Sequence, residues 1–167
     1  MDWKNKLSGG NLRSIGKASE AVAEVKSQAA FDSLFACLHE SDRLLVMRAA
    51  DAIEKITKTR PEYLVTHKEA LLRFCLSETP KEFKWHLALL LPRLLLSEKE
   101  AYEAFAILKK WALNPKESRI VRANALQSLC QLTKENQAFQ KDYSSIVGAV
   151  EKENVPSLNA RLRKITG

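Results

Sequence analysis

The chain has 167 residues, 46% of them hydrophobic and 28% charged, which is enough for a folded domain with a sizeable core. Only 5 glycines and 5 prolines punctuate it, so the composition disfavours a strand-rich fold with frequent turns and favours long helices joined by short loops. The net charge of +7 admits an acidic protein or a nucleic acid as a partner.

Neither the N-terminus nor the longest apolar run predicts a membrane or secretory role. The first ten residues, MDWKNKLSGG, lack the apolar core of a signal peptide. The apolar run at 87–96 contains Pro92 and Arg93 and is too short to span a bilayer. Three cysteines lie within apolar helical runs without a CxxC pair, which argues against a disulfide or zinc framework: Cys37, Cys75 and Cys130. We therefore expect a cytoplasmic protein with no membrane contact.

Residues 1–27 are expected to form an N-terminal cap or arm. The run Ser8-Gly9-Gly10-Asn11 breaks this segment, and Leu7, Leu12 and Ile15 are expected to cover the first repeat. Such a cap is needed because the terminal unit of a helical stack otherwise exposes its apolar face.

From residue 28 onwards, capping residues and helical periodicity predict eight helices in four antiparallel pairs. The expected pairs occupy residues 28–60, 61–96, 97–135 and 136–166. Expected helix starts are Ser41-Asp42, Pro61, Thr79 as N-cap before Pro80, Ser97 with Glu100 as a capping box, Asn114-Pro115, Asn136, and Asn154 with Pro156. Pro92 should kink the helix in which it lies, because proline removes one backbone hydrogen bond.

Two independent columns of apolar residues give one repeat length. The second helices align at Leu45, Phe83, Val121 and Leu158, in steps of 38, 38 and 37 residues. The first helices align at Leu34, Leu71, Leu108 and Ile146, in steps of 37, 37 and 38 residues. A period near 40 with two helices per unit is typical of HEAT and armadillo solenoids.

The segments MRAADAIEKI (Met47 to Ile56) and VRANALQSLCQL (Val121 to Leu132) resemble the second-helix consensus of HEAT repeats. This resemblance implies an all-α, right-handed α-α solenoid of about four HEAT-like hairpins, with the second helices lining a concave face. Between the two layers we expect a buried leucine core, made of Leu87, Leu91, Leu94, Leu108, Leu129 and Leu132.

The helical phase then selects a predicted partner-binding face on the second helices. At about 100° per residue, some positions point away from each helix's own core face, and others lie on its flank and form a ladder along the stack. These residues are Met47, Arg48, Asp51, Lys84, Trp85, His86, Leu89, Arg122, Asn124, Gln127 and Arg161. A tryptophan among arginines has the composition of an interaction hot spot. The alternative is that Trp85 fills volume between helices and that the arginines pair locally with Asp51 and Glu54.

The predicted function is a non-catalytic, monomeric HEAT-repeat scaffold that binds a protein, an acidic one being compatible with the charge, without a cofactor. No Gly-rich phosphate loop is present, and His39-Glu40 is one His-Glu pair where HEAT-fold di-iron hydroxylases use several. The second hypothesis is a nucleic-acid-binding module similar to HEAT-like DNA alkylpurine glycosylases, whose concave face carries Trp and Asp. Against it, Trp111 belongs to a first-helix core pattern, and four repeats are too few to wrap a duplex.

Overall fold

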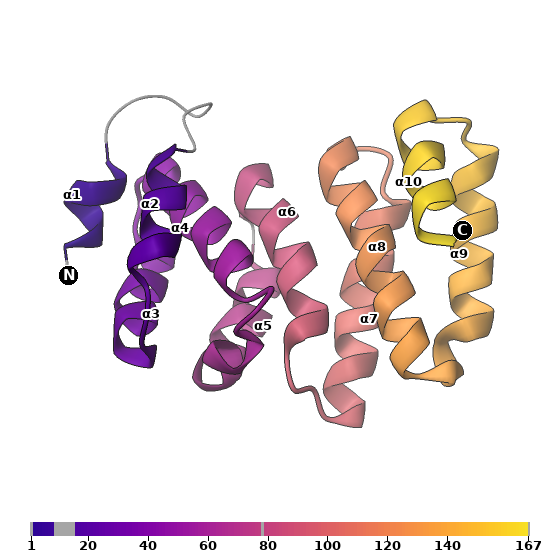
Figure 1. Cartoon of the computed structure of the whole chain (residues 1–167). Coiled ribbons are helices and arrows are strands. Elements are labelled where there is room, and N and C mark those ends of the chain that lie inside the picture. Colours follow the sequence, from indigo (N-terminus) through magenta and orange to yellow (C-terminus); the bar gives the residue numbers. More distant parts are fainter. Residues whose placement is uncertain (1, 9–15, 78, 167) are drawn as a thin grey trace. The chain divides into compact units, whose positions relative to one another are not determined.

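The computed structural model describes residues 2–8, 16–77 and 79–166, and within these ranges every regular element is helical. The chain divides into two compact units, Met1–Glu69 and Ala70–Gly167, and helix α5 (Lys68–Leu76) crosses the boundary. Both units are drawn in Figure 1 and are described separately below. Within the described ranges, none of the helices has the length and apolar character that a membrane span requires.

The first unit is built around α4. Its elements are α1 (Trp3–Leu7), α2 (Gly16–Glu24), α3 (Gln28–Phe35), the 3-10 turn η1 (Ala36–His39), α4 (Arg43–Ile56) and the 3-10 segment η2 (Pro61–His67). The carboxylate of Asp42 caps α4 by accepting hydrogen bonds from the amides of Leu44 and Leu45 at 2.8 and 3.2 Å. Helices α1, α2 and α3 all contact α4. The N-terminal segment therefore packs on the first repeat, although Leu12 and Ile15 lie outside the described residues.

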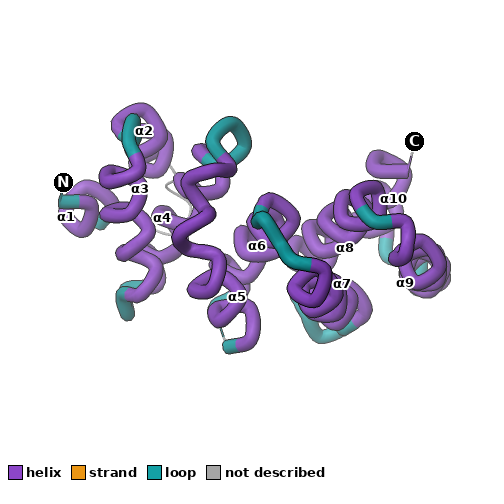
Figure 2. Tube along the Cα trace, turned by 90° about the horizontal axis from the view of Figure 1, so that it is seen from below, coloured by secondary structure: helices purple, strands orange, loops and turns teal. Residues whose placement is uncertain are grey.

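The second unit contains two layers of helices (Figures 1 and 2). Its further elements are α6 (Lys81–Leu90), η3 (Leu91–Arg93), α7 (Glu98–Leu113), α8 (Arg119–Glu135), η4 (Gln137–Phe139), α9 (Gln140–Lys152) and α10 (Pro156–Thr166). Helix α8 packs between α6 and α10 in one layer, whereas α7 contacts α9 in the other. The all-helical hairpin arrangement predicted from the sequence is thus confirmed for this unit.

The predicted leucine core lies between these layers. All six residues are buried, with relative exposures from 0 to 7%: Leu87, Leu91, Leu94, Leu108, Leu129 and Leu132. The capping box before α7 is also confirmed. The amide of Ser97 donates to the carboxylate of Glu100 at 2.6 Å, and the amide of Glu100 donates to the hydroxyl of Ser97 at 3.3 Å.

Some predicted helix boundaries are wrong. Pro80, not Thr79, is the N-cap of α6, and the Thr79 hydroxyl is buried without a hydrogen-bond partner among the described residues. Helix α6 ends at Leu90, and Pro92 lies in the 3-10 turn that follows, because its ring cannot continue the α-helical hydrogen bonding.

Two further starts differ from the prediction. Pro61 opens the 3-10 segment η2 instead of an α-helix. Helix α8 begins four residues after Pro115, with Ser118 as its N-cap, whose hydroxyl accepts a hydrogen bond from the amide of Val121 at 3.2 Å. Ser118 is the N-cap because its hydroxyl can accept a hydrogen bond from an amide in the first turn of the helix.

Candidate functional site

The eleven residues of the predicted partner face lie on α4, α6, α8 and α10, but the structure does not leave all of them accessible. Five are buried, at 0 to 9% exposure: Met47, Arg48, His86, Arg122 and Asn124. The expectation that these five are available to a partner is wrong. Gln127 is exposed, and the remaining five are partly exposed: Asp51, Lys84, Trp85, Leu89 and Arg161.

In the first unit, the N-terminal helices account for the burial of Arg48. Helices α1 and α2 pack against α4, and the Arg48 guanidinium donates to the carbonyl oxygen of Leu7 at 2.5 Å. The guanidinium is fully buried, at 0% exposure, and Met47 beside it is exposed by only 4%. Arg48 therefore holds the end of α1 on α4, because a buried charge is tolerated only where its donors are satisfied.

In the second unit, polar side chains of α8 bind the backbone of α6. The amide nitrogen Nδ2 of Asn124 donates to the carbonyl of Trp85 at 2.9 Å, and the hydroxyl of Ser128 donates to the carbonyl of Ala88 at 2.7 Å. A backbone carbonyl has two lone pairs, so it can accept these bonds in addition to its helical bond. Asn124, which was predicted to form part of a ladder along the stack, thus joins two neighbouring helices.

Two basic residues make corresponding ion pairs in successive repeats. Lys84, early in α6, lies 2.9 Å from the carboxylate of Glu117, just before α8. Arg122, early in α8, lies 2.7 Å from the carboxylate of Glu153, just before α10. Arg122 also donates through Nε to the carbonyl of Ala112 at 2.8 Å, near the end of α7. Each pair therefore connects the start of one second-layer helix to the start of the next.

These ion pairs neutralise much of the positive charge that was predicted for the partner-binding face. The side chains of Lys84 and Glu117 are only 16% and 12% exposed, and the ammonium group also lies over the Trp111 ring at 5.7 Å. Arg161 donates to the side-chain oxygen of Gln127. The basic residues thus support the packing of the unit instead of forming an open cationic groove.

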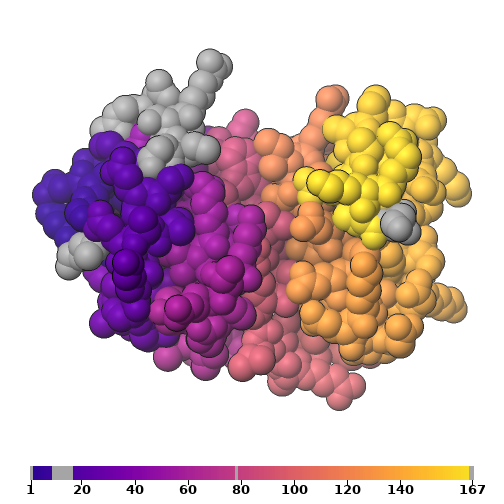
Figure 3. Space-filling model, viewed as in Figure 1, coloured from indigo at the N-terminus to yellow at the C-terminus, as the bar shows by residue number. Residues whose placement is uncertain are grey.

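The accessible part of the predicted face in the second unit is a smaller surface, which we call the α6–α10 surface. Apart from Lys84, which is paired with Glu117, it consists of Trp85, Leu89, Gln127 and Arg161. The indole of Trp85 meets the His86 ring edge-on, with centroids 5.9 Å apart. The backbone of Trp85 is fixed by Asn124, and Gln127 is joined to Arg161 on α10. In the space-filling view, α8 and α10 present one continuous surface, coloured orange and yellow (Figure 3).

Sequence reasoning missed Glu117, Glu153 and Ser128 as partners of the second-layer helices. A signal for the two glutamates was present, because Lys84 and Arg122 are 38 residues apart and Glu117 and Glu153 are 36 apart. Opposite charges that recur with the repeat period predict ion pairs between repeats.

Among the titratable side chains of the described residues, His67 and Cys75 take part in the packing of the helices. No group of three or more His, Cys, Asp or Glu residues in the described part of the chain could hold a metal ion. His67 lies 2.7 Å from the Asp32 carboxylate and stacks on Phe35 with centroids 3.9 Å apart. Burial raises the pKa of the Cys75 thiol to about 12, so the thiolate is less accessible at neutral pH than that of an exposed cysteine.

Comparison with known proteins identifies a family. A family model described as a HEAT repeat domain matches residues 3–167. No curated protein and no solved structure matches the chain. The match begins at α1, so it includes the N-terminal helices together with the repeats recognised in the sequence.

Proposed function

Because the chain belongs to the HEAT-repeat family, we propose that it is a non-catalytic scaffold that binds a protein partner on the α6–α10 surface of its second unit. The observation that carries this proposal is the partial exposure of Trp85 and Leu89 on a helix whose other large apolar side chains are buried.

The chemistry of this surface suits a protein partner. A tryptophan supplies a large, rigid contact area, and an arginine supplies directed hydrogen bonds, so these residue types contribute much of the binding energy at protein interfaces. The backbone at Trp85 is held by Asn124, which donates to its carbonyl oxygen, and the indole contacts the His86 ring. Binding to such a surface costs little ordering of the protein.

The internal pairing of basic residues favours a protein over a nucleic acid. Lys84 and Arg122 already contact Glu117 and Glu153, and Arg48 is buried against Leu7. Phosphate binding depends on accessible cations that can displace counterions. Only Arg161 remains as a partly exposed arginine of the predicted face, and its guanidinium is joined to Gln127.

A cytoplasmic, monomeric protein remains our expectation. Its three cysteines are all free and buried, which suits a reducing compartment.

Affinity capture from the native lysate, with and without nuclease, tests the proposal. Wild-type protein should capture a partner that nuclease does not release, and Trp85→Ala and Leu89→Ala should each lose it. Leu76→Ala is the matched control, because Leu76 is 77% exposed on α5, outside the proposed surface. If Trp85→Ala retains every partner of the wild type, or if nuclease releases them all, the α6–α10 surface does not have the proposed function.

A further inference from the structure

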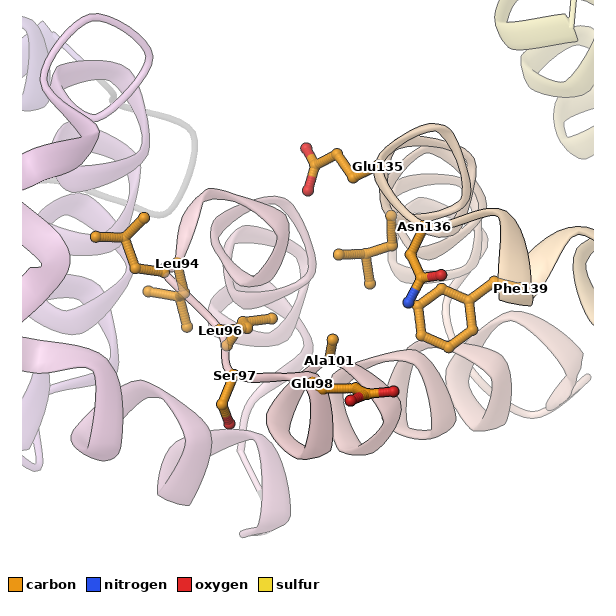
Figure 4. Close-up of a pocket in the computed structure, with 10 residues that line it drawn as sticks. Leu94, Leu96, Ser97, Glu98, Ala101, Glu135, Asn136 and Phe139 are labelled. Atoms are coloured by element: carbon orange, nitrogen blue, oxygen red, sulfur yellow. The ribbon is translucent and has the colours of Figure 1, made fainter.

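A second candidate surface is a groove of the second unit that is lined by both apolar and polar side chains (Figure 4). The groove has a volume of about 460 Å³ and is lined by the segment after η3, the first turns of α7, the end of α8 and η4. Its lining residues are Leu94, Leu95, Leu96, Ser97, Glu98, Ala101, Leu132, Glu135, Asn136 and Phe139. None of them belongs to the α6–α10 surface.

The groove has a preformed aromatic wall. Phe139 stacks on Phe105 with centroids 4.3 Å apart and an interplanar angle of 15°. Tyr102, 48% exposed, packs edge-on against the same Phe139 ring at 4.9 Å. These contacts hold the wall in place before anything binds, so little side-chain ordering is needed on binding.

The other wall exists because Pro92 ends the helix before it. Leu94 has an extended backbone, with φ −77° and ψ 144°, so the chain leaves η3 without continuing the helix. Leu95 is consequently 74% exposed while Leu94 is buried. Leu95 therefore adds exposed apolar area to the groove, next to the partly exposed Leu96 and Ala101, and clustered apolar area marks interaction sites.

The charge of the groove is opposite to that of the whole protein. Figure 4 shows Glu135 on one side of the pocket and Glu98 on the other. Both residues are exposed, and the one neighbouring lysine after Glu98, Lys99, lies 3.9 Å from Glu103. Glu135 accepts a hydrogen bond from Gln131 at 3.3 Å. A chain of net charge +7 thus presents a groove whose charged lining residues are two glutamates.

We propose that this groove binds a short segment of a partner protein in which apolar side chains are flanked by Lys or Arg. The apolar side chains would pack on Leu95, Leu96 and Ala101, which keep accessible apolar area that binding would remove from water. The buried side chains of Leu94, Leu132 and Phe139 form the floor below them. The flanking cations would pair with Glu98 and Glu135, which gives the segment its charge preference. An acidic segment or a nucleic acid would be repelled at the same carboxylates.

A random 12-residue peptide-display library, selected on the immobilised full chain, supplies the probe. Enriched peptides are labelled with fluorescein, and their binding is measured by anisotropy. The variants Leu95→Glu and Ala101→Trp alter the groove, and Glu98→Lys with Glu135→Lys reverses its charge. The charge-matched control is Glu20→Lys with Glu151→Lys, because both residues are exposed on α2 and α9, away from the groove. Circular dichroism confirms that each variant is folded.

The enriched peptides should combine apolar residues with Lys or Arg. Charge reversal should weaken their binding at least tenfold, as should Leu95→Glu or Ala101→Trp, whereas the control pair and Trp85→Ala should leave it unchanged. The proposal fails if no enrichment depends on the groove, if the enriched peptides are acidic, or if charge reversal has no effect. It also fails if sedimentation shows a dimer that Leu95→Glu dissociates, since the occupant would then be a second copy.

Discussion

Helices α4 and α6 occupy equivalent places in the repeat, yet they differ in what their outward positions do. Met47 on α4 is buried, at 4% exposure, beside Arg48, which binds Leu7. Trp85, at the position of α6 equivalent to Met47, is partly exposed. The helical phase is the same in both cases. What differs is the neighbouring chain, since α1 and α2 pack on α4 within the first unit. Accessibility in a helical stack is therefore decided by the elements that cover a helix as much as by its own amphipathic pattern.

The largest expected effect is on the leucine core between the two layers of helices. Replacing Leu91, which has 0% exposure, by Ala should lower the free energy of unfolding by about 2–5 kcal/mol, through lost burial and the cavity left behind. Trp85→Ala should cost far less, because Trp85 is partly exposed. Urea unfolding of both variants measures the difference. Equal losses would mean that Trp85 belongs to the core, and the contrast between α4 and α6 would disappear.

The second effect concerns the contact that covers α4. Arg48→Met removes the donor to Leu7 while keeping an apolar stem, and it should cost about 2 kcal/mol, because a buried carbonyl loses a charged partner. Hydrogen exchange should become faster in residues 3–7 than elsewhere in the first unit. Arg43→Ala, at the exposed start of the same helix, is the control. Unchanged exchange in α1 would show that Arg48 does not hold this helix.

The sequence predicted the fold more fully than the site. Capping residues such as Asp42 and Ser97 act locally, and the leucine spacing repeats, so helices and core could be read from the sequence. Exposure depends on contacts between distant segments. Helix α8 has 17 residues, of which 11 are buried, including Ala123 and Cys130 opposite its expected core face. A helix covered on several sides has no single outward face, and a period of 3.6 residues cannot reveal that.

The polar residues were misjudged for a related reason. Arg48, Arg122 and Asn124 were predicted to be accessible because the helical phase places them off the core face of their helices. In the structure each of them satisfies a carbonyl or a carboxylate on another segment. Only the long-range partner distinguishes a buried clamp from a binding residue, and the partner lies 31 to 41 residues away in these three cases.

A smaller effect separates an ion pair between repeats from one within a helix. A double-mutant cycle on Lys84 and Glu117, whose side chains are 16% and 12% exposed, should give a coupling energy of about 1 kcal/mol. The pair Asp51 and Lys55, four residues apart on α4, should give about 0.3 kcal/mol. Urea unfolding of the single and double alanine variants supplies both values. If the coupling of Lys84 with Glu117 is no larger than that of the helical pair, the ion pair contributes little to stability, and Lys84 remains available to bind a ligand.

The smallest expected effect is a pH dependence confined to the first unit. Partial burial acts to raise the pKa of Asp32, but hydrogen bonds from Gln28 and His67 outweigh it and hold this pKa below its ordinary value. A carboxyl whose pKa is lower in the folded state contributes stability above its unfolded pKa of about 3.9. That contribution is lost as the pH falls through the folded pKa. It should stay below about 1 kcal/mol, because the Asp32 side chain is 46% exposed and solvent screens the charge.

Substituting Asp32 by Asn provides the measurement. The variant should be slightly less stable than the wild type at pH 7, and the two stabilities should converge below about pH 4, where the wild-type carboxyl becomes protonated. Thermal unfolding followed by circular dichroism between pH 2 and pH 7 detects the convergence. Because Asp32 links α3 to η2 through His67, the local effect should appear as faster hydrogen exchange in residues 61–67. A constant difference at every pH would show that Asp32 stabilises the unit through its shape and neutral hydrogen bonds, and that its charge contributes nothing.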